Sequence, residues 1–169
     1  MKIIWYPAVT LDGYIADPRG RADFVTAEDD RQWGELVQAA GAVIVGRRTF
    51  DQYRGVVYPL AGATTYVATR DTKLMSADPA VVYVTGGPLE VMRRLHAGGH
   101  AIAVLAGGGQ AAGLFAQANL IDEAWISLYP RLLGAGVRLL GDYRGELRLT
   151  FKEGYAMPGG VVHNRYDVG

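Results

Sequence analysis

Glycine directly follows three short apolar runs of the sequence, at Gly46 in VIVGRRTF, Gly86 in VYVTGGP and Gly107 in VLAGGGQ. If these runs are strands of an open α/β sheet, their carboxyl ends border the crevice where ligands bind. A glycine there lets the backbone approach a ligand closely, and the free amides at the start of the next helix favour a phosphate. The segment from Gly107 to Gln110 therefore predicts a cradle for a pyrophosphate. A tight turn alone would also explain its glycines, whose spacing is not G-x-G-x-x-G.

Basic and hydroxyl side chains follow two of the strand-like runs. Arg47, Arg48 and Thr49 come after the first, and Thr69 and Arg70 follow TYVA. Guanidinium groups form charge-assisted hydrogen bonds with phosphate, and hydroxyl groups add further donors. The set would suit a ligand with phosphates at separate points, such as a dinucleotide carrying an extra ribose phosphate. Each arginine taken singly could equally be a solvated side chain at a strand exit.

The elements that must position these residues alternate along the chain. A helix is predicted from Thr26, which with Asp29 resembles a capping box, to Gly41. PLEVMRRLHAGG and GQAAGLFAQAN predict two more helices, and ELRLTFKEG with GGVVHNRYDV predicts an antiparallel hairpin at the sheet edge. This alternation favours an α/β domain with right-handed crossovers. Strands are predicted at Lys2–Ala8, Ala42–Val45, Thr64–Ala68, Val81–Thr85 and Ala101–Ala106.

The composition excludes several classes of protein. The 169 residues, 50% of them hydrophobic, predict one domain over residues 1–169. The 17 basic and 17 acidic residues form no run of one sign, so we expect no nucleic-acid or membrane partner. Cysteine is absent, and His96, His100 and His163 lack metal-ligand spacing, so we take them as solvated loop residues and expect no metal. The apolar runs are too short to span a membrane and MKIIWYPAVTLDG lacks a signal-peptide pattern, so we expect a soluble, cytoplasmic protein.

The sequence resembles a known family in four motifs that follow the family's order: AVTLDGYIA, VIVGRRTF, TYVATR and IAVLAGGGQAAGLFAQANLIDEAWISLYPRLLGAGVRLL. They are similar to the dihydrofolate reductase-like superfamily, in particular to the reductase domain of the bifunctional riboflavin-biosynthesis enzyme, the RibD C-terminal group. The resemblance implies a mostly parallel central sheet flanked by helices, a C-terminal antiparallel hairpin, and NADPH as cofactor. Carried over by position, it assigns Gly46, Arg47 and Thr49 to the cofactor phosphates, Thr69 and Arg70 to the adenosine ribose phosphate, Gly107, Gly108, Gly109 and Gln110 to the pyrophosphate, and Ala8, Ile15 and Ala16 to the border of the nicotinamide.

The resemblance also points to a carboxylate at the substrate end. Dihydrofolate reductases hold the pterin with a helix carboxylate, and counting without gaps from VIVGRRTF through Trp33 assigns that role to Asp30. A buried carboxylate there could bind a heterocycle and influence the proton transfer that accompanies hydride transfer. On a helical wheel, however, Asp29 points nearer the centre of the apolar stripe, and aspartates at a helix start also favour the helix dipole. Asp12 in TLDGYIA is the other acidic candidate, with a turn to its own backbone as the alternative.

Two departures from the family leave the substrate open. Tyr14 follows LDG where the riboflavin enzymes often carry a basic residue, and Ala112 stands after GGG where folate reductases commonly have a tyrosine. The deaminase motifs H-x-E and P-C-x-x-C are absent.

We therefore expect an NADPH-dependent reductase that transfers hydride to a small heterocyclic substrate, pterin-like or ribosylaminopyrimidine-like. The alternative is a non-catalytic dinucleotide-binding module that acts as a sensor or structural subunit. We also expect a homodimer, because relatives often dimerise and AWISLYPRLLGAGVRLL is apolar enough for an interface. A strand buried inside the monomer would look the same.

Overall fold

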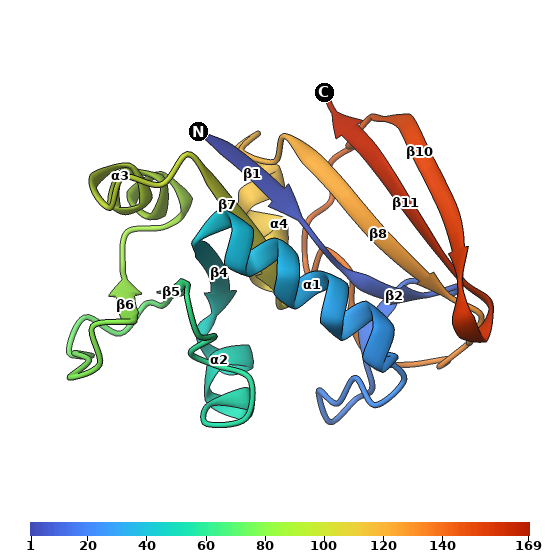
Figure 1. Ribbon diagram of the computed structural model, residues 1–169, viewed down its shortest axis with the longest axis horizontal. Coiled ribbons are helices and arrows are strands. Elements are labelled where there is room, and N and C mark those ends of the chain that lie inside the picture. The colour runs from blue at the N-terminus through green and yellow to red at the C-terminus, as the bar shows by residue number, and fades with distance from the viewer.

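A large sheet with helices on both of its faces organises the computed structural model, which describes residues 1–169 (Figure 1). The helices are α1 (Ala27–Ala40), α2 (Arg47–Tyr53), α3 (Pro88–Ala97) and α4 (Gly109–Gln117). The strands are β1 (Lys2–Trp5), β2 (Ala8–Thr10), β3 (Tyr14–Ala16), β4 (Ala42–Gly46), β5 (Thr64–Ala68), β6 (Val81–Val84), β7 (Ile102–Gly107), β8 (Glu123–Tyr129), β9 (Val137–Arg138), β10 (Leu149–Met157) and β11 (Val161–Val168).

The strand order in the main sheet is β10-β11-β8-β1-β7-β4-β5-β6, and β2 also pairs with β8. All pairs from β8 to β6 are parallel, whereas β10 and β11 form an antiparallel hairpin that adds to β8. A separate ribbon consists of β3 and β9. The predicted α/β class, with a mostly parallel sheet and a C-terminal hairpin, is therefore confirmed.

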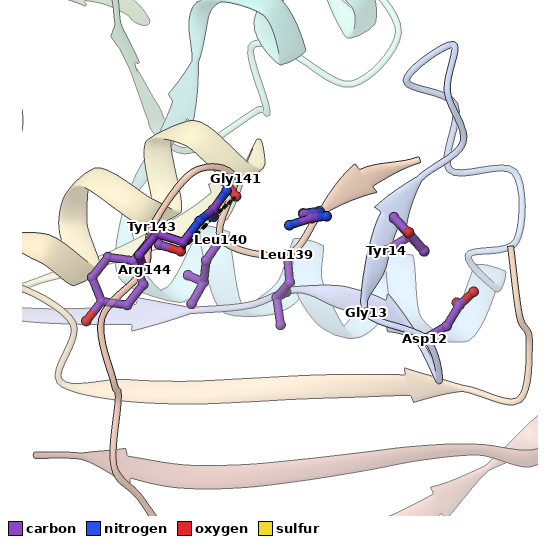
Figure 2. A pocket seen from close by; sticks show the side chains of 9 residues that line it. Asp12, Gly13, Tyr14, Leu139, Leu140, Gly141, Tyr143 and Arg144 are labelled. Carbon is purple, nitrogen blue, oxygen red and sulfur yellow. Dashed lines mark hydrogen bonds between the residues drawn. The ribbon is translucent and has the colours of Figure 1, made fainter. Parts of the chain in front are cut away.

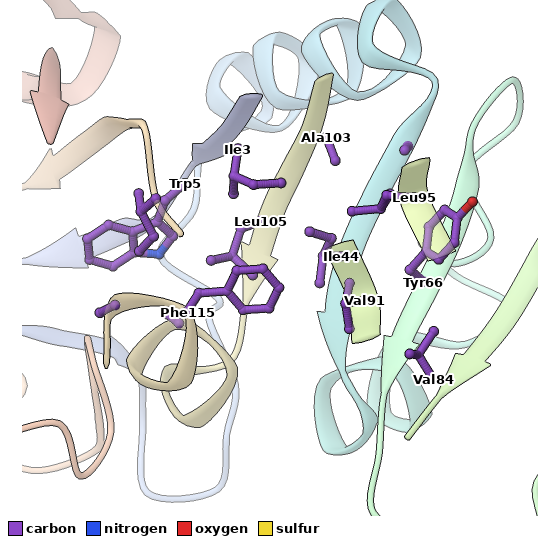
Figure 3. Packing of buried hydrophobic residues seen from close by; sticks show 14 of the residues in the cluster. Ile3, Trp5, Ile44, Tyr66, Val84, Val91, Leu95, Ala103, Leu105 and Phe115 are labelled. Atoms are coloured by element: carbon purple, nitrogen blue, oxygen red, sulfur yellow. The ribbon is translucent and has the colours of Figure 1, made fainter. Parts of the chain in front are cut away.

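Apolar side chains form a core on each face of the sheet. On one face, Leu105 of β7 packs with Val91 of α3 and Phe115 of α4 (Figure 3). On the other face, Val37 of α1 and Phe50 of α2 cover the central strands. Both faces of the central strands are thus buried, which explains their almost unbroken apolar runs.

The start and end of α1 follow the sequence signals. The Thr26 hydroxyl accepts a hydrogen bond from the Asp29 amide at 3.4 Å, and Gly41 ends the helix with a left-handed φ of 72°. Three other elements were not predicted: α2, the β3–β9 ribbon and β8. The predicted strand Lys2–Ala8 is in fact two strands, interrupted at Tyr6 and Pro7. The apolar run AWISLY forms most of β8, which lies inside the sheet between β1 and β11. No helix combines the length and the apolar character that crossing a membrane would require.

Two glycines of α4 allow this helix to lie against the segment that follows β9. A Cβ atom on Gly109 would be 2.2 Å from the carbonyl oxygen of Arg138, and one on Gly113 would be 2.3 Å from that of Leu140. Both neighbours are backbone atoms, so a side chain at either position would force the helix away. The close approach fixes the start of α4 relative to β9.

We expect opposite effects from alanine at two helix glycines. Gly113→Ala should lower the free energy of unfolding by about 1–3 kcal/mol, because the methyl group meets the Leu140 carbonyl. Gly34→Ala, in α1, should raise it by up to about 1 kcal/mol, because nothing lies within 4 Å of the new atom and alanine favours the helix. Denaturant unfolding measures both, and equal changes would contradict the packing described for α4.

Candidate functional site

The exits of three neighbouring parallel strands lie side by side at one edge of the sheet. Val45 of β4 is in register with Gly107 of β7, and Gly46 of β4 is in register with Ala68 of β5. The predicted phosphate-binding segments that follow β4, β5 and β7 therefore begin at the same edge. Because α2 and α4 start directly after these strands, their first amides also face this edge.

Neither α2 nor α4 has a side-chain cap at its first turn, unlike α1. The N-cap residues are Gly46 and Gly108. Gly108 donates its amide to the Thr49 hydroxyl at 3.3 Å, which joins the two helix starts. Gly107 has a φ of 138°, and a Cβ atom built on it would meet nothing within 4 Å. The strand edge thus offers free amides and open space beside Gly107, as a phosphate cradle requires.

The rest of the glycine segment has a packing role that the sequence did not reveal. Gly109 is buried, and its missing side chain makes room for the Arg138 carbonyl. The Gln110 side chain is exposed and donates to Asp142 at 2.5 Å, so it contacts the segment after β9. The Gln110 side chain is therefore already engaged, and Gly141 packs against the backbone of both residues. Their role as cofactor contacts stays a prediction.

The arginines at the strand exits differ in their charge partners. Arg47 donates to Asp51 at 2.6 Å, and its guanidinium lies 5.7 Å from the centre of the Tyr83 ring. Arg48 and Arg70 are exposed and form no ion pair. The Thr69 hydroxyl accepts from the Asp71 amide at 3.1 Å and keeps its own proton for a further acceptor. Arg48 and Arg70 are therefore freer to bind a phosphate than Arg47.

The residues predicted beside the nicotinamide approach this edge from two sides. The Tyr6 amide donates to the Leu105 carbonyl at 3.1 Å, so the chain entering Ala8 runs along the end of β7. Ile15 and Ala16 lie in β3, whose partner β9 carries the carbonyl that abuts Gly109. The β3–β9 ribbon therefore lies next to the start of α4. Contact of these three residues with a nicotinamide stays a prediction.

The buried carboxylate of α1 is Asp29, whereas Asp30 is exposed, which contradicts the buried position expected for Asp30. A catalytic role for Asp30 stays a prediction. The pKa of Asp30 is raised, mainly by partial burial and to a smaller extent by the negative charge of Asp29. Asp29 is only 2% exposed and accepts three hydroxyl hydrogen bonds of 2.7 Å each, from Tyr6, Ser127 and Tyr129. The helical wheel pointed to this residue, since Asp29 lies nearer the centre of the buried stripe.

The hydroxyl groups around Asp29 come from two different parts of the sheet. Tyr6 lies between β1 and β2, and Ser127 and Tyr129 lie in β8. Burial, together with the neighbouring Asp29, raises the pKa of Tyr6 far above its usual value. Burial likewise raises the pKa of Tyr129 to about 12. Both phenols therefore remain protonated donors at physiological pH. Because Ser127 is paired with Ala8, this cluster lies directly beside the strand predicted to border the nicotinamide.

His163 extends this cluster toward the C-terminal hairpin. It lies in β11 and is 1% exposed, so its interpretation as a solvated loop residue was wrong. Its Nδ1 atom is 2.9 Å from the Ser127 hydroxyl. Burial lowers the pKa of His163, which keeps the ring neutral at physiological pH. Alternation along GGVVHNRYDV, with Val161 and His163 on one face, was the signal that could have predicted its burial.

Asp12, the second acidic candidate, links the turn after β2 to the loop after β8 by hydrogen bonds. It accepts from the Thr10 hydroxyl at 2.6 Å and from the amides of Leu133 and Gly134 at 2.9 and 2.7 Å. These bonds, the Thr10 contact first, lower the pKa of Asp12, so it stays ionised at neutral pH and is poorly suited to donate a proton. The arrangement is closer to the turn-forming alternative than to a substrate contact. A catalytic role for Asp12 stays a prediction.

A surface hollow of about 380 Å³ lies beside Asp12 (Figure 2). A second hollow, of about 480 Å³, lies on the other side of residues 141–145 and shares Tyr143 and Arg144 with the first. Neither hollow is lined by Gly46, Gly107 or Gly108, although Gln110 at the start of α4 lines the second. The first is lined by Asp12, Gly13, Tyr14, Arg138, Leu139, Leu140, Gly141, Tyr143 and Arg144.

Comparison with known proteins finds likeness along the whole chain. Residues 1–163 match the model of the family described as RibD C-terminal domain. The uncharacterized protein YwjB of Bacillus subtilis is 30% identical over 156 residues, which are 89% of this chain and 89% of that protein. A solved structure from Shewanella sp. PV-4, named for riboflavin biosynthesis, has 26% identity and a TM-score of 0.84, over 100% of this chain and 99% of its own. The bifunctional deaminase/reductase of Thermotoga maritima has 16% identity and a TM-score of 0.79, and the match covers 99% of this chain and 56% of that enzyme.

We expect Asp29→Asn to destabilise the protein by about 3 kcal/mol, because three buried hydroxyls lose a charged acceptor and one of them faces the new amide group. The neighbouring Asp30→Asn is the matched control, and it should change the free energy of unfolding by less than about 0.5 kcal/mol because Asp30 is exposed. Denaturant unfolding of both variants provides the measurement. Similar losses in the two would show that the cluster around Asp29 does not stabilise the fold.

Proposed function

Because the chain belongs to the RibD C-terminal domain family, we propose that it is an NADPH-dependent reductase that delivers hydride to a small heterocyclic substrate. The observation that carries the proposal is the strand edge itself. Gly107 leaves open space there, the starts of α2 and α4 have no side-chain cap, and Arg48 and Arg70 are unpaired. A dinucleotide with a pyrophosphate and an extra ribose phosphate is the ligand that such a set suits.

The residues present fit the cofactor at each of its three polar parts. Amides at the start of α4, with the positive end of the helix dipole, would hold the pyrophosphate. Thr69 and Arg70 would bind the ribose phosphate, and Ala8 and Ile15 would border the nicotinamide. When bound, NADPH supplies the hydride, and the protein's part is to orient it and to exclude water.

Asp29 would hold the substrate end. It is a buried carboxylate at the first turn of α1, next to the strand that carries Ala8. A carboxylate at this position would accept hydrogen bonds from the N–H groups of a heterocycle, which supports a pterin-like or aminopyrimidine-like substrate. The Thermotoga maritima relative is named as a 5-amino-6-(5-phosphoribosylamino)uracil reductase, which supports the second of these classes. Tyr14, where the riboflavin enzymes often have a basic residue, argues for a different substrate from theirs.

Cofactor binding and turnover test the proposal directly. NADPH added to the purified protein should show altered fluorescence, because Tyr6 belongs to the cluster beside Ala8 and the Trp125 ring lies 6.4 Å from that of His163. With an oxidised pterin or aminopyrimidine added, NADPH absorbance should then fall. Binding without loss of absorbance for any heterocycle would favour a non-catalytic dinucleotide-binding module. Failure of NADPH to bind would refute both functions.

Arg70→Ala should weaken NADPH binding at least tenfold and leave NADH binding almost unchanged. The substitution removes a charge-assisted contact to the extra phosphate, worth about 1.5–3 kcal/mol. Arg19→Ala is the matched control, because Arg19 is likewise exposed and free of ion pairs but lies in the loop after β3. Titration calorimetry with both cofactors would give the four affinities. An equal loss for NADPH and NADH would remove Arg70 from the phosphate site.

A further inference from the structure

The hydrogen bonds between Asp29 and His163 run in one direction. A carboxylate only accepts, so the Ser127 hydroxyl must donate its single proton to Asp29, at 2.7 Å. The Ser127 oxygen, 2.9 Å from His163 Nδ1, can then only accept from that nitrogen. His163 is therefore the tautomer with the proton on Nδ1. In this series of hydrogen bonds, His163 Nδ1–H donates to the Ser127 oxygen, and the Ser127 hydroxyl donates to the Asp29 carboxylate.

The other ring nitrogen of His163 is left without a partner. In this tautomer Nε2 is an acceptor, and it is buried with no hydrogen bond. The rings of Tyr6 and Tyr155 lie over His163 at centroid distances of 5.2 and 5.3 Å, and that of Trp125 at 6.4 Å. An unpaired buried acceptor lowers the stability of the fold.

Charged and titratable groups face His163 from several elements. Asp29 of α1 and Glu153 of β10 favour the protonated ring, whereas Arg165 of β11 opposes it, and burial opposes it most. Tyr155 also closes the outer side, where its hydroxyl donates to Gln32 of α1 at 2.7 Å. Tyr155 itself is 39% exposed. The Tyr155 ring thus lies against His163, is itself partly exposed to solvent, and is tied to α1 by one hydrogen bond.

We propose that Ser127 and His163 form a relay that carries a proton from the hairpin side of the molecule to Asp29. This deepens the proposed reductase function and rests on it, since reducing a C=N or C=O bond needs one proton with each hydride. A proton from water binds Nε2 as Tyr155 moves aside, and an Nε2–H bond forms. The Nδ1–H bond breaks as Ser127 gains that proton, and the Ser127 proton passes to an oxygen of Asp29. Asp29 then gives it to the substrate heteroatom that bears the new lone pair.

The relay balances without any oxidant or reductant of its own. One proton enters at Nε2 and one leaves from Asp29, while the C=N double bond of the imidazole shifts from Cε1–Nε2 to Cε1–Nδ1. After each delivery His163 has the proton on Nε2, and Ser127 has the former Nδ1 proton. The relay resets when the Ser127 hydroxyl turns back to Asp29, a proton from water binds Nδ1 and the Nε2 proton returns to water. His163 and Ser127 are thus positioning residues, because neither touches the substrate.

Nitrogen NMR of the His163 ring tests the direction of the chain without cofactor or substrate. At neutral pH, the ring of the full-length protein should carry its proton on Nδ1. Ser127→Ala should abolish this preference, because Nδ1 loses its acceptor, and Ser127→Thr should retain it. Thr65→Ala is the matched control, since its hydroxyl is also buried in a strand but has no hydrogen-bond partner, and it should leave His163 unchanged. A proton found on Nε2 in the unaltered protein would overturn the relay.

Kinetics on the heterocycle that the turnover assay identifies would test the delivery of the proton. Ser127→Ala should lower kcat about a hundredfold, with the KM for NADPH unchanged, and the loss should grow as pH rises. Ser127→Thr should recover most of the rate, and Thr65→Ala should match the unaltered protein. An unchanged kcat in Ser127→Ala would refute the relay while the reductase function stands. Absence of NADPH binding would refute the reductase function and with it the relay's purpose, whatever tautomer is seen.

Discussion

The carboxylate of Asp29 joins parts of the chain that are distant in sequence. Through three hydroxyl groups it ties the first turn of α1 to Tyr6 at the exit of β1 and to two residues of β8. These strands are neighbours only because β8 crosses back to lie beside β1. All three hydrogen bonds to this buried carboxylate must form, because each broken one would leave a buried polar group without a hydrogen-bond partner. The cluster therefore fixes where α1 begins relative to the sheet, and with it the wall of the candidate substrate site.

The strand edge is organised by a different constraint, the close approach of backbone to backbone. Gly109 and Gly113 let α4 pack directly on β9 and the segment after it, which fixes the position of the helix start. Beside Gly107 the same turn has open space, whereas Gly108 lies against the Thr49 hydroxyl. One run of glycine thus serves both packing and a ligand site. The sequence therefore predicted a phosphate site at the glycine run. It could not predict which of the glycines border that site and which serve packing.

Much of the fold was predictable from local signals. Thr26, Asp29 and Gly41 mark the ends of α1, and the apolar runs mark the central strands, because both patterns reflect burial and backbone geometry within a few residues. The short helix α2 was missed because RRTFDQY is too brief for a periodic pattern. The run AWISLY was left open between an interface and the interior, since a strand's own sequence does not say what covers it.

The two halves of the candidate site differed in how far the sequence could go. The candidate cofactor half consists largely of backbone at strand exits, where the glycines and arginines are visible in the sequence. The substrate half consists of side chains from α1, β8, β11 and the connection between β1 and β2, and His163 gave no signal beyond the alternation of its strand. The ungapped comparison with dihydrofolate reductases pointed to Asp30 and not to Asp29. A shift of one residue along a helix rotates the side chain by about 100°, which is enough to move it from the buried face to the exposed one.

The saturation of Asp29 limits how a substrate can bind there. A carboxylate offers about four acceptor positions, and three are already occupied by hydroxyl groups. A heterocycle with one N–H donor can use the fourth without disturbing the cluster. An amidine-like edge with two donors, as in a pterin, requires one hydroxyl to turn away, and the freed hydroxyl can then donate to an acceptor atom of the same ring. The site therefore favours either a single-donor substrate or one that pairs two donors with an adjacent acceptor.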